Sequence, residues 1–352
     1  MDDALLPPLL ERIRAAHAAG RPLAIRGHGS KAFYGNPVAG EVLDVTGLAG
    51  IVDYQPRELT VTARAGTALA DLEAALAAHG QMLAFEPPRF GGRGTLGGTL
   101  ASGLGGPRRA YAGGVRDAVL GVRIVDGRGQ PLRFGGQVIK NVAGYDVARL
   151  MVGALGTLGL ITEATLKVLP RPACEQTRVF ACDEAEAIAR MNAWAAQPLP
   201  LSASAWHSGR LWLRLSGAEA AVRAAAARLG GEACTEGAAF WDGLRDHALP
   251  LFAARPLWRL AVASTAPPLG LPGQTLVEAG GGVRWSDADL PAAQLRALAR
   301  AHGGHATLFR GAPLADGNFP PPPPAVAALQ RRLRAQFDPR AVFNRGRLFP
   351  ED

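Results

Sequence analysis

The chain has 352 residues, of which 48% are hydrophobic and 19% charged, and its formal net charge is +8. This length exceeds the size at which one hydrophobic core keeps growing, so we expect two domains, and the composition excludes an intrinsically disordered protein. No apolar run approaches the roughly 20 residues that span a membrane, and the first ten residues, MDDALLPPLL, lack the features of a signal peptide. We therefore expect a cytoplasmic protein.

The cysteines and the basic residues exclude further classes of protein. Cys174, Cys182 and Cys234 are widely spaced and form no C-x-x-C pair, so we expect neither a disulfide framework nor a metal site built from this chain's thiolates. The basic residues are nearly all arginines, scattered and interrupted by acids, which disfavours nucleic-acid binding. Such an excess of positive charge suits an anionic small molecule or an acidic protein partner.

The first half of the chain alternates short strands, helices and glycine-rich turns. Helices are predicted where apolar residues recur with a helical period, and strands where they alternate with polar ones. In chain order we predict a helix over 5–19, strands over 23–26, 42–45 and 59–65, a helix over 68–79 capped by Thr67, a hairpin of 119–125 with 132–134, a short helix over 147–151, and a strand after Gly159. Pro170 and Pro172 predict a domain boundary.

Beyond these prolines, glycine becomes rarer and strands alternate with helices. We predict strands over 178–181, 202–207, 211–215, 258–264, 283–285 and 306–310, and helices over 184–196, 218–229, 292–302 and 325–337. Two such β-α-β rounds are typical of a ferredoxin-like α+β layer with an antiparallel sheet. The proline run 320–324 predicts a stiff polyproline II connector. We expect the chain to divide into residues 1–172, 173–324 and 325–352.

Three glycine-rich turns in the first half predict a phosphate site. They lie at 26–30, 94–106 and 153–159. Backbone amides can face a phosphate where no Cβ obstructs them, and hydroxyl donors are available on Ser30, Thr95 and Ser102. The alternative is that these are structural turns without a ligand. Three such turns in one domain favour a large phosphorylated ligand.

Other glycine-rich nucleotide sites do not fit. Residues 92–97 match G-x-G-x-x-G, but the preceding FEPPRFG contains prolines that a central strand would not tolerate, so we reject a nicotinamide site. The sequence holds no G-x-x-x-x-G-K-[ST] and no G-x-S-x-G, which argues against a P-loop nucleotidase and a serine hydrolase.

The turns and their flanks resemble the FAD-binding domain of the vanillyl-alcohol-oxidase/PCMH-type flavoproteins. The resemblance rests on PLAIRGHGSK, LTVTARAGT, TLGGTLASGLGGPRR and KNVAGYDVARLMVGALGTLGLITEATLKVLPRP, and covers residues 23–172. Further segments, including FGGQVIKNVAGYD, FWDGLRDH, GGHATLFR and FDPRAVFNRGRLFP, are similar to the FAD-binding (E-type) subunits of bacterial glycolate oxidases. The resemblance implies an α+β fold: a PCMH-type domain of two α+β subdomains, a ferredoxin-like cap or substrate domain, and a C-terminal helix and tail returning to the FAD domain.

The resemblance also implies which residues bind FAD. By position they are Arg26, Gly27, His28, Gly29, Ser30, Pro87, Thr95, Leu96, Gly97, Gly98, Ala101, Ser102, Gly153, Gly156, Gly159 and Ile161. The third segment departs from the family's usual Gly-Ser-Glu-Gly-Thr, because Ala154 and Leu155 replace its serine and glutamate. Some relatives attach flavin covalently through a histidine in the first turn, but His28 does not have their spacing, so we expect non-covalent FAD.

The resemblance implies a subunit of a complex that oxidises glycolate, a 2-hydroxy acid, to glyoxylate. Its partners would be a catalytic FAD subunit and an iron–sulfur subunit that receives electrons through FAD. Turnover of a hydroxy acid needs a carboxylate clamp and a base. Candidates here are His305, Arg310 and His247, although His305 and Arg310 would point to opposite faces of a regular strand. The alternatives left open are a self-sufficient oxidoreductase of a D-2-hydroxy acid or sugar lactone, and association of the complex with the inner face of the cytoplasmic membrane.

Overall fold

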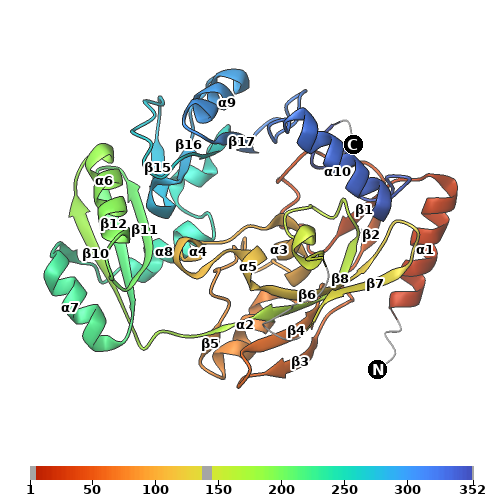
Figure 1. Cartoon of the computed structure of the whole chain (residues 1–352), viewed down its shortest axis with the longest axis horizontal. Coiled ribbons are helices and arrows are strands. Elements are labelled where there is room, and N and C mark those ends of the chain that lie inside the picture. Colours follow the sequence, from red (N-terminus) through yellow and green to blue (C-terminus); the bar gives the residue numbers. More distant parts are fainter. Residues whose placement is uncertain (1–4, 137–144, 351–352) are drawn as a thin grey trace.

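The computed structural model describes residues 5–136 and 145–350, which form two parts built on two main sheets (Figure 1). The sheet of the first part is antiparallel with the order β3-β4-β8-β6-β7. Its strands are β3 (Ile51–Gln55), β4 (Thr60–Arg64), β8 (Leu160–Lys167), β6 (Val119–Val125) and β7 (Pro131–Gly135). Two smaller sheets flank it: β1 (Leu23–Arg26) runs parallel to β2 (Glu41–Asp44), and β5 (Gln81–Met82) pairs with β9 (Leu169–Pro170).

Helices of the first part cover this sheet and the β1–β2 ribbon. They are α1 (Leu6–Ala19), α2 (Leu69–Ala77), α3 (Leu96–Ser102), α4 (Arg109–Ala112), α5 (Val115–Ala118) and the 3₁₀ helix η1 (Ala148–Met151). Apolar residues of α2 and α3 pack against β4, β6 and β8 in one core. A separate core packs α1 against β1 and β2, so the first part consists of two α+β subdomains.

The second part is a single eight-stranded antiparallel sheet with the order β13-β10-β12-β11-β15-β16-β14-β17. Its strands are β10 (Cys174–Ala181), β11 (Leu201–His207), β12 (Arg210–Gly217), β13 (Glu232–Ala233), β14 (Leu257–Ala261), β15 (Thr275–Glu278), β16 (Val283–Ser286) and β17 (His305–Arg310). The helical segments are α6 (Glu184–Ala195), α7 (Glu219–Leu229), α8 (Gly237–Arg245), η2 (Pro250–Ala253), η3 (Ala279–Gly281) and α9 (Ala292–Ala301).

This sheet is a tandem of two ferredoxin-like units. In each half the spatial order of the strands is fourth, first, third, second, and the two second strands, β11 and β15, pair antiparallel at the centre. The first half has both helices of the motif, α6 and α7, whereas the second half has only α9 because segment 262–274 contains no helix. The predicted ferredoxin-like antiparallel layer is therefore confirmed.

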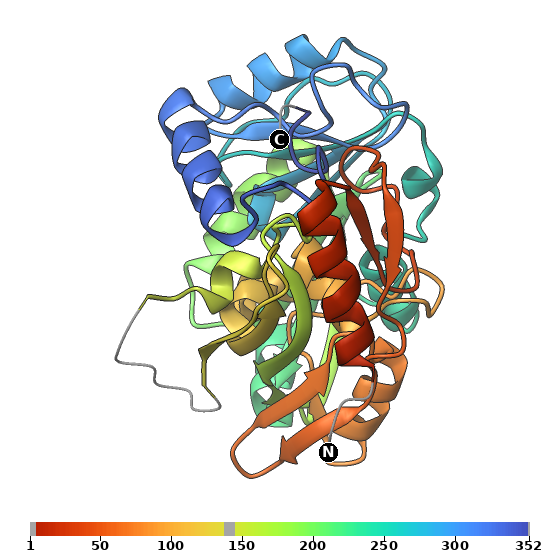
Figure 2. The same ribbon diagram turned by 90° about the vertical axis from the view of Figure 1, so that its right-hand side faces the viewer.

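The C-terminal segment returns to the first part, and Figure 2 shows its helix near α1. In α10 (Pro324–Phe337) Phe337 lies in the core around the first sheet, with its ring 6.1 Å from that of Phe134. Val342 and Phe343 then pack in the core of the β1–β2 subdomain, where Phe343 bridges to Leu23. No helix within residues 5–136 and 145–350 is long and apolar enough to cross a membrane.

The predicted elements correspond to observed ones, with specific differences. The prediction has no counterpart for the strands β3, β5, β13 and β15 or for the helical segments α3, α4, α5, α8, η2 and η3. Thr67 does not cap α2: its hydroxyl donates to the Gly50 carbonyl, and Ala68 holds the N-cap position. Pro324 is not part of a connector but opens α10, because proline fits the first turn of a helix. Most of FGGQVIKNVAGYD lies outside the described residues.

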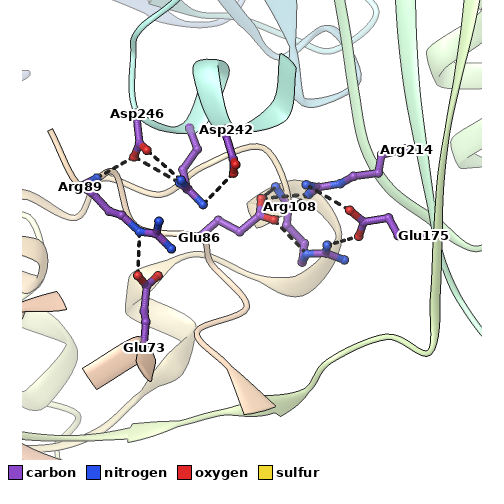
Figure 3. Close-up of polar contacts among 9 residues, drawn as sticks. Glu73, Glu86, Arg89, Arg108, Glu175, Arg214, Asp242 and Asp246 are labelled. Atoms are coloured by element: carbon purple, nitrogen blue, oxygen red, sulfur yellow. Dashed lines mark hydrogen bonds and ion pairs between the residues drawn. The ribbon is translucent and has the colours of Figure 1, made fainter. Parts of the chain in front are cut away.

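Two ionic clusters hold the parts together (Figure 3). In one, the carboxylate of Glu86 binds Arg108 at 3.2 Å and Arg214 of β12 at 2.9 Å, and Arg108 also reaches Glu175 of β10 at 2.6 Å. In the other, Asp246 at the end of α8 accepts from the backbone amide of Arg89, whose side chain binds Glu73 of α2 at 2.7 Å. Both clusters join a loop of the first part to the second part.

Candidate functional site

One cavity of about 470 Å³ lies in the first part, a size within the range of ligand pockets in proteins. It is enclosed by the β1–β2 ribbon, one side of α3, the loop that leads into β8, and the C-terminal tail. All described residues that line it belong to residues 24–161 or to the tail, so the eight-stranded sheet contributes nothing to its wall.

The cavity brings the three predicted glycine turns together. The predicted FAD-binding residues on its wall are Arg26, Gly27, His28, Gly29, Ser30, Thr95, Gly97, Gly98, Ala101, Ser102, Gly156, Gly159 and Ile161. Three others do not line it: Pro87 is buried, Leu96 is a core residue, and Gly153 is exposed. Sequence reasoning missed Lys31, Asn344 and Arg347, all of which line the cavity.

The first turn follows β1 and keeps its amides available. None of the backbone amides of residues 27–31 donates a hydrogen bond in the described part of the chain. Gly29 has a φ of 72°, which reverses the chain beyond β1. A run of unpaired amides around such a reversal forms a concave anion-binding surface. This turn therefore has the geometry expected of a phosphate site.

The second turn is built differently, because its glycines serve packing. The amide of Leu96 donates to the Thr67 carbonyl at 2.9 Å, and that of Gly97 donates to the Ala65 carbonyl at 2.7 Å. The amide of Gly98 donates to Oγ1 of Thr95, the N-cap of α3. A Cβ on Gly97 would lie 2.7 Å from the Cβ of Ala65, so glycine is required for α3 to approach β4. The expectation that this turn offers free amides is wrong at these positions.

The third turn is fixed to α3 and to the C-terminal tail. Gly153 and Leu155 donate their amides to the carbonyls of Leu100 and Ala101. Asn344 joins the tail to two segments, because its amide group donates to the Leu155 carbonyl at 2.6 Å and accepts from the Ile25 amide at 2.8 Å. A Cβ on Gly156 would lie 2.7 Å from the Asn344 Nδ2. The tail thus positions both the first and third turns.

The cavity wall is positively charged. Arg26, Lys31 and Arg347 line it together with His28, and no carboxylate is among its described residues. The Nδ1 of His28 and the Nζ of Lys31 are buried and have no hydrogen-bond partner in the part of the chain that the structure describes. Burial lowers the pKa of Lys31 to about 8, because the charged form is poorly solvated there. Buried polar groups without partners are rare, so an anionic ligand fits this site.

The candidate catalytic side chains lie away from this cavity. His247 is enclosed by rings, stacked on Phe252 at 4.5 Å and in edge contact with Trp285 and Phe309 at 5.0 Å. Burial lowers its pKa to about 3. The Arg310 guanidinium lies 4.2 Å from the centre of the Phe33 ring, and His305 is exposed at the start of β17. None of the three candidates lines the cavity.

Comparison with known proteins shows similarity over the whole chain. Residues 9–135 match the family model described as an FAD binding domain. The glycolate oxidase subunit GlcE of Escherichia coli is 46% identical over 344 residues, covering 97% of each chain. The glycolate oxidase subunit GlcD of Bacillus subtilis is 33% identical over 54% of this chain and 42% of its own. A solved alkyldihydroxyacetonephosphate synthase superimposes with a TM-score of 0.66 over 96% of this chain and 73% of its own, and at 17% identity this shows the fold alone.

Proposed function

The chain belongs to the family of FAD-binding E-type subunits of glycolate oxidase, within the PCMH-type flavoproteins, and we propose that it serves in a complex that oxidises glycolate to glyoxylate. Proteins of this family are FAD-dependent oxidoreductases that act on CH–OH groups, and FAD is the cofactor. The observation that carries the proposal is the cavity of the first part, with its cluster of unpaired amides and cations.

The residues of the cavity fit this dinucleotide. The amides of residues 27–31 and the cationic side chains would hold its phosphates, whereas Ala101, Gly156 and Ile161 supply small or apolar wall for its rings. When bound, FAD supplies a ring system that takes up the two electrons and the proton lost from the α-carbon of a hydroxy acid. The chain's own part is to orient the cofactor and to keep it from water.

The placement of the catalytic candidates favours a subunit over a self-sufficient oxidoreductase. Oxidation of a hydroxy acid needs a cation for its carboxylate and a base for its hydroxyl beside the cofactor. His247 lies within an aromatic cluster, and Arg310 packs over a ring of the same cluster. We therefore assign glycolate turnover to the assembled complex, with a catalytic FAD subunit.

Mixing with glycolate in the absence of oxygen tests this assignment. We expect the purified chain with FAD to keep its absorbance near 450 nm, and the complex with its partner subunits to lose it. We also expect dye reduction by glycolate only with the complex. Rapid bleaching of the isolated chain by glycolate or another D-2-hydroxy acid would instead support the self-sufficient alternative.

We further propose that an iron–sulfur subunit accepts the electrons. Cys174, Cys182 and Cys234 are separate free thiols, so a cluster would have to come from another chain.

We also propose the division of the chain into an FAD-binding domain (1–172), a cap (173–324) and a returning C-terminal segment (325–352). The complex would act in the cytoplasm, with association at the inner face of the membrane as an alternative.

We predict that the flavin is not covalently attached. His28 lines the cavity, but a cofactor held by amides and cations needs no covalent bond. After acid precipitation of the purified protein, the yellow colour is expected in the supernatant, as it is for a His28→Asn variant that can form no histidyl linkage. A yellow pellet from the unmodified protein, together with a colourless pellet from the variant, would contradict the prediction.

A further inference from the structure

Lys31 is an unusual residue for this chain. The sequence has 38 lysines and arginines together, and its lysines are Lys31, Lys140 and Lys167. Lysine carries a compact ammonium charge on a flexible stem, whereas arginine presents a broad planar group with five donors. In a chain that otherwise uses arginine, a lysine therefore indicates a confined position that suits a compact ammonium group.

The backbone of Lys31 is fixed and its ammonium is enclosed. Its carbonyl accepts a hydrogen bond from Nη2 of Arg347 at 3.0 Å. Its Nζ lies 4.0 Å from the position of a Cβ on Gly98, and 5.5 Å from the centre of the Phe90 ring. The ammonium thus lies between the first turn and the start of α3, on the cavity wall, and within residues 5–136 and 145–350 it has no hydrogen-bond partner.

Among the described residues, those that line the cavity with this ammonium include other cations but no carboxylate. Arg26 and Arg347 line the same cavity, and the Arg310 guanidinium lies 5.7 Å from the centre of the Phe90 ring. The carboxylate of Asp44 interacts electrostatically with Arg26, but it accepts two hydrogen bonds from Thr46 and does not line the cavity. A buried ammonium is costly without a partner, and the described residues supply none, so an anionic ligand suits this position.

We propose that the ammonium of Lys31 binds the diphosphate of FAD, together with the free amides of residues 27–31. The inference rests on the proposed function, because it names a phosphate ligand within the same site. The diphosphate is favoured over the flavin ring because Lys31 continues the run of unpaired amides, and both groups recognise phosphate oxygens. Lys31 is accordingly a cofactor-binding residue that contacts the diphosphate of FAD and not its flavin ring.

A matched pair of variants tests the proposal through affinity. Lys31→Met removes the charge and retains the length of the side chain, and Lys167→Met is the control, because Lys167 lies at the end of β8 outside the cavity. We expect Lys31→Met to weaken binding of both FAD and ADP roughly 10- to 100-fold, the range of a charge-assisted hydrogen bond, and Lys167→Met to leave both unchanged. Titration calorimetry measures these affinities, and circular dichroism checks the fold.

Each outcome decides between specific alternatives. Unchanged affinities in a folded Lys31→Met variant would overturn the proposal, and so would weakened FAD binding with unchanged ADP binding, which would place the ammonium at the flavin ring. If the unmodified chain binds neither FAD nor ADP, the proposed function itself fails.

A second measurement needs no variant. Saturating ADP is expected to protect Lys31, but not Lys167, from acetylation by acetic anhydride, and the mass of the peptides measures this protection. Equal acetylation of Lys31 with and without bound ADP would also contradict the proposal.

Protonation supplies a further signature. An anion beside Lys31 favours its charged form, so we expect FAD affinity to be highest below pH 8 and to decline as the pH rises above 8. This decline is expected to disappear in Lys31→Met. Arg26, His28, Arg347 and Arg310 are present in both proteins, so the comparison isolates the contribution of Lys31. A variant that keeps the full decline would exclude Lys31 as its origin.

Discussion

The chemical role of His247 depends on where its side chain is buried. Its ring contacts Phe90, Phe252, Trp285 and Phe309, and its Nδ1 has no hydrogen-bond partner. In sequence it resembles a catalytic base, because histidine titrates near neutral pH. In the structure it is a neutral aromatic packing group, since burial and the neighbouring Arg310 lower its pKa to about 3.

The low pKa of His247 predicts a pH dependence of stability. The unfolded chain protonates this histidine near its ordinary value of 6.5 and the folded chain only near 3, so the unfolded state binds more protons between these values. The free energy of unfolding should therefore fall by up to about 1.4 kcal/mol for each pH unit below 6.5 on account of this residue. We expect His247→Phe to reduce the slope in urea unfolding between pH 6.5 and 5. Identical slopes would show that His247 titrates normally.

Helix α3 illustrates how one short element forms the site. It contains Gly97 and Gly98, which disfavour helix, and yet it forms because Thr95 caps its first turn and Leu96 and Leu100 are buried in the core. Its approach to β4 brings Gly97 into contact with Ala65. The same packing places Gly98 and Ala101 on the cavity wall.

The cap predicts a measurable loss of helix stability. Thr95→Ala removes the oxygen that accepts from the Gly98 amide, whereas Thr95→Ser retains it. We expect the alanine variant to lose about 1 kcal/mol of unfolding free energy and the serine variant to lose much less. Equal losses in urea denaturation would show that the methyl group of Thr95, and not its hydroxyl, stabilises α3.

The close contact between α3 and β4 predicts that a larger residue at position 97 lowers the free energy of unfolding. Gly97→Ala would place a Cβ 2.7 Å from that of Ala65, so α3 has to shift away from β4. Overpacking of this kind costs about 1–3 kcal/mol, and we expect weaker FAD binding as well because α3 lines the cavity. Gly114→Ala is the control, since its nearest neighbour would be 3.8 Å away. Unchanged stability and affinity in Gly97→Ala would mean that α3 is not held at this distance.

At the scale of the whole molecule, the two parts are joined by buried charges. Glu86 is 15% exposed and binds Arg108 and Arg214, which are 9% and 4% exposed. Burial would raise the pKa of Glu175, but Arg214 and hydrogen bonds from Ser216 and Arg108 outweigh it, so the pKa is lowered. A carboxyl whose pKa is lowered by folding stabilises the folded state when the pH is above the pKa of the unfolded chain. This stabilisation is lost as the pH falls through the lower pKa of the folded chain. The junction should therefore weaken below about pH 4.5.

Removal of the central carboxylate tests the junction. Glu86→Gln leaves Arg108 and Arg214 buried with one partner fewer, and breaking a buried ion pair costs about 3 kcal/mol or more. Glu41→Gln is the control, because the Arg12–Glu41 pair is exposed and such pairs contribute less than about 1 kcal/mol. We expect urea unfolding of Glu86→Gln to shift much further than that of Glu41→Gln. Similar shifts would show that the junction depends on apolar contacts.

Elements whose signals are local can be predicted from the amino-acid sequence. The strand over 23–26, the hairpin of 119–125 and the β-α-β alternation beyond 172 follow from periodicity and turn residues, and each is close to what the structure has. Short elements such as β15 and the glycine-containing α3 and α8 were missed, because they are stabilised by sheet pairing and by buried side chains such as Trp241.

Which of several similar residues share a site depends on long-range packing. The amides of residues 27–31 are free and those of Leu96 and Gly97 are bonded, although all lie in glycine-rich turns, because the partner carbonyls come from distant segments. Lys31, Asn344 and Arg347 join the cavity for the same reason, since Asn344 reaches Ile25 and Leu155 only after the tail folds back. Local periodicity therefore specifies the strands and helices, whereas long-range packing selects the amides and cations that meet a ligand.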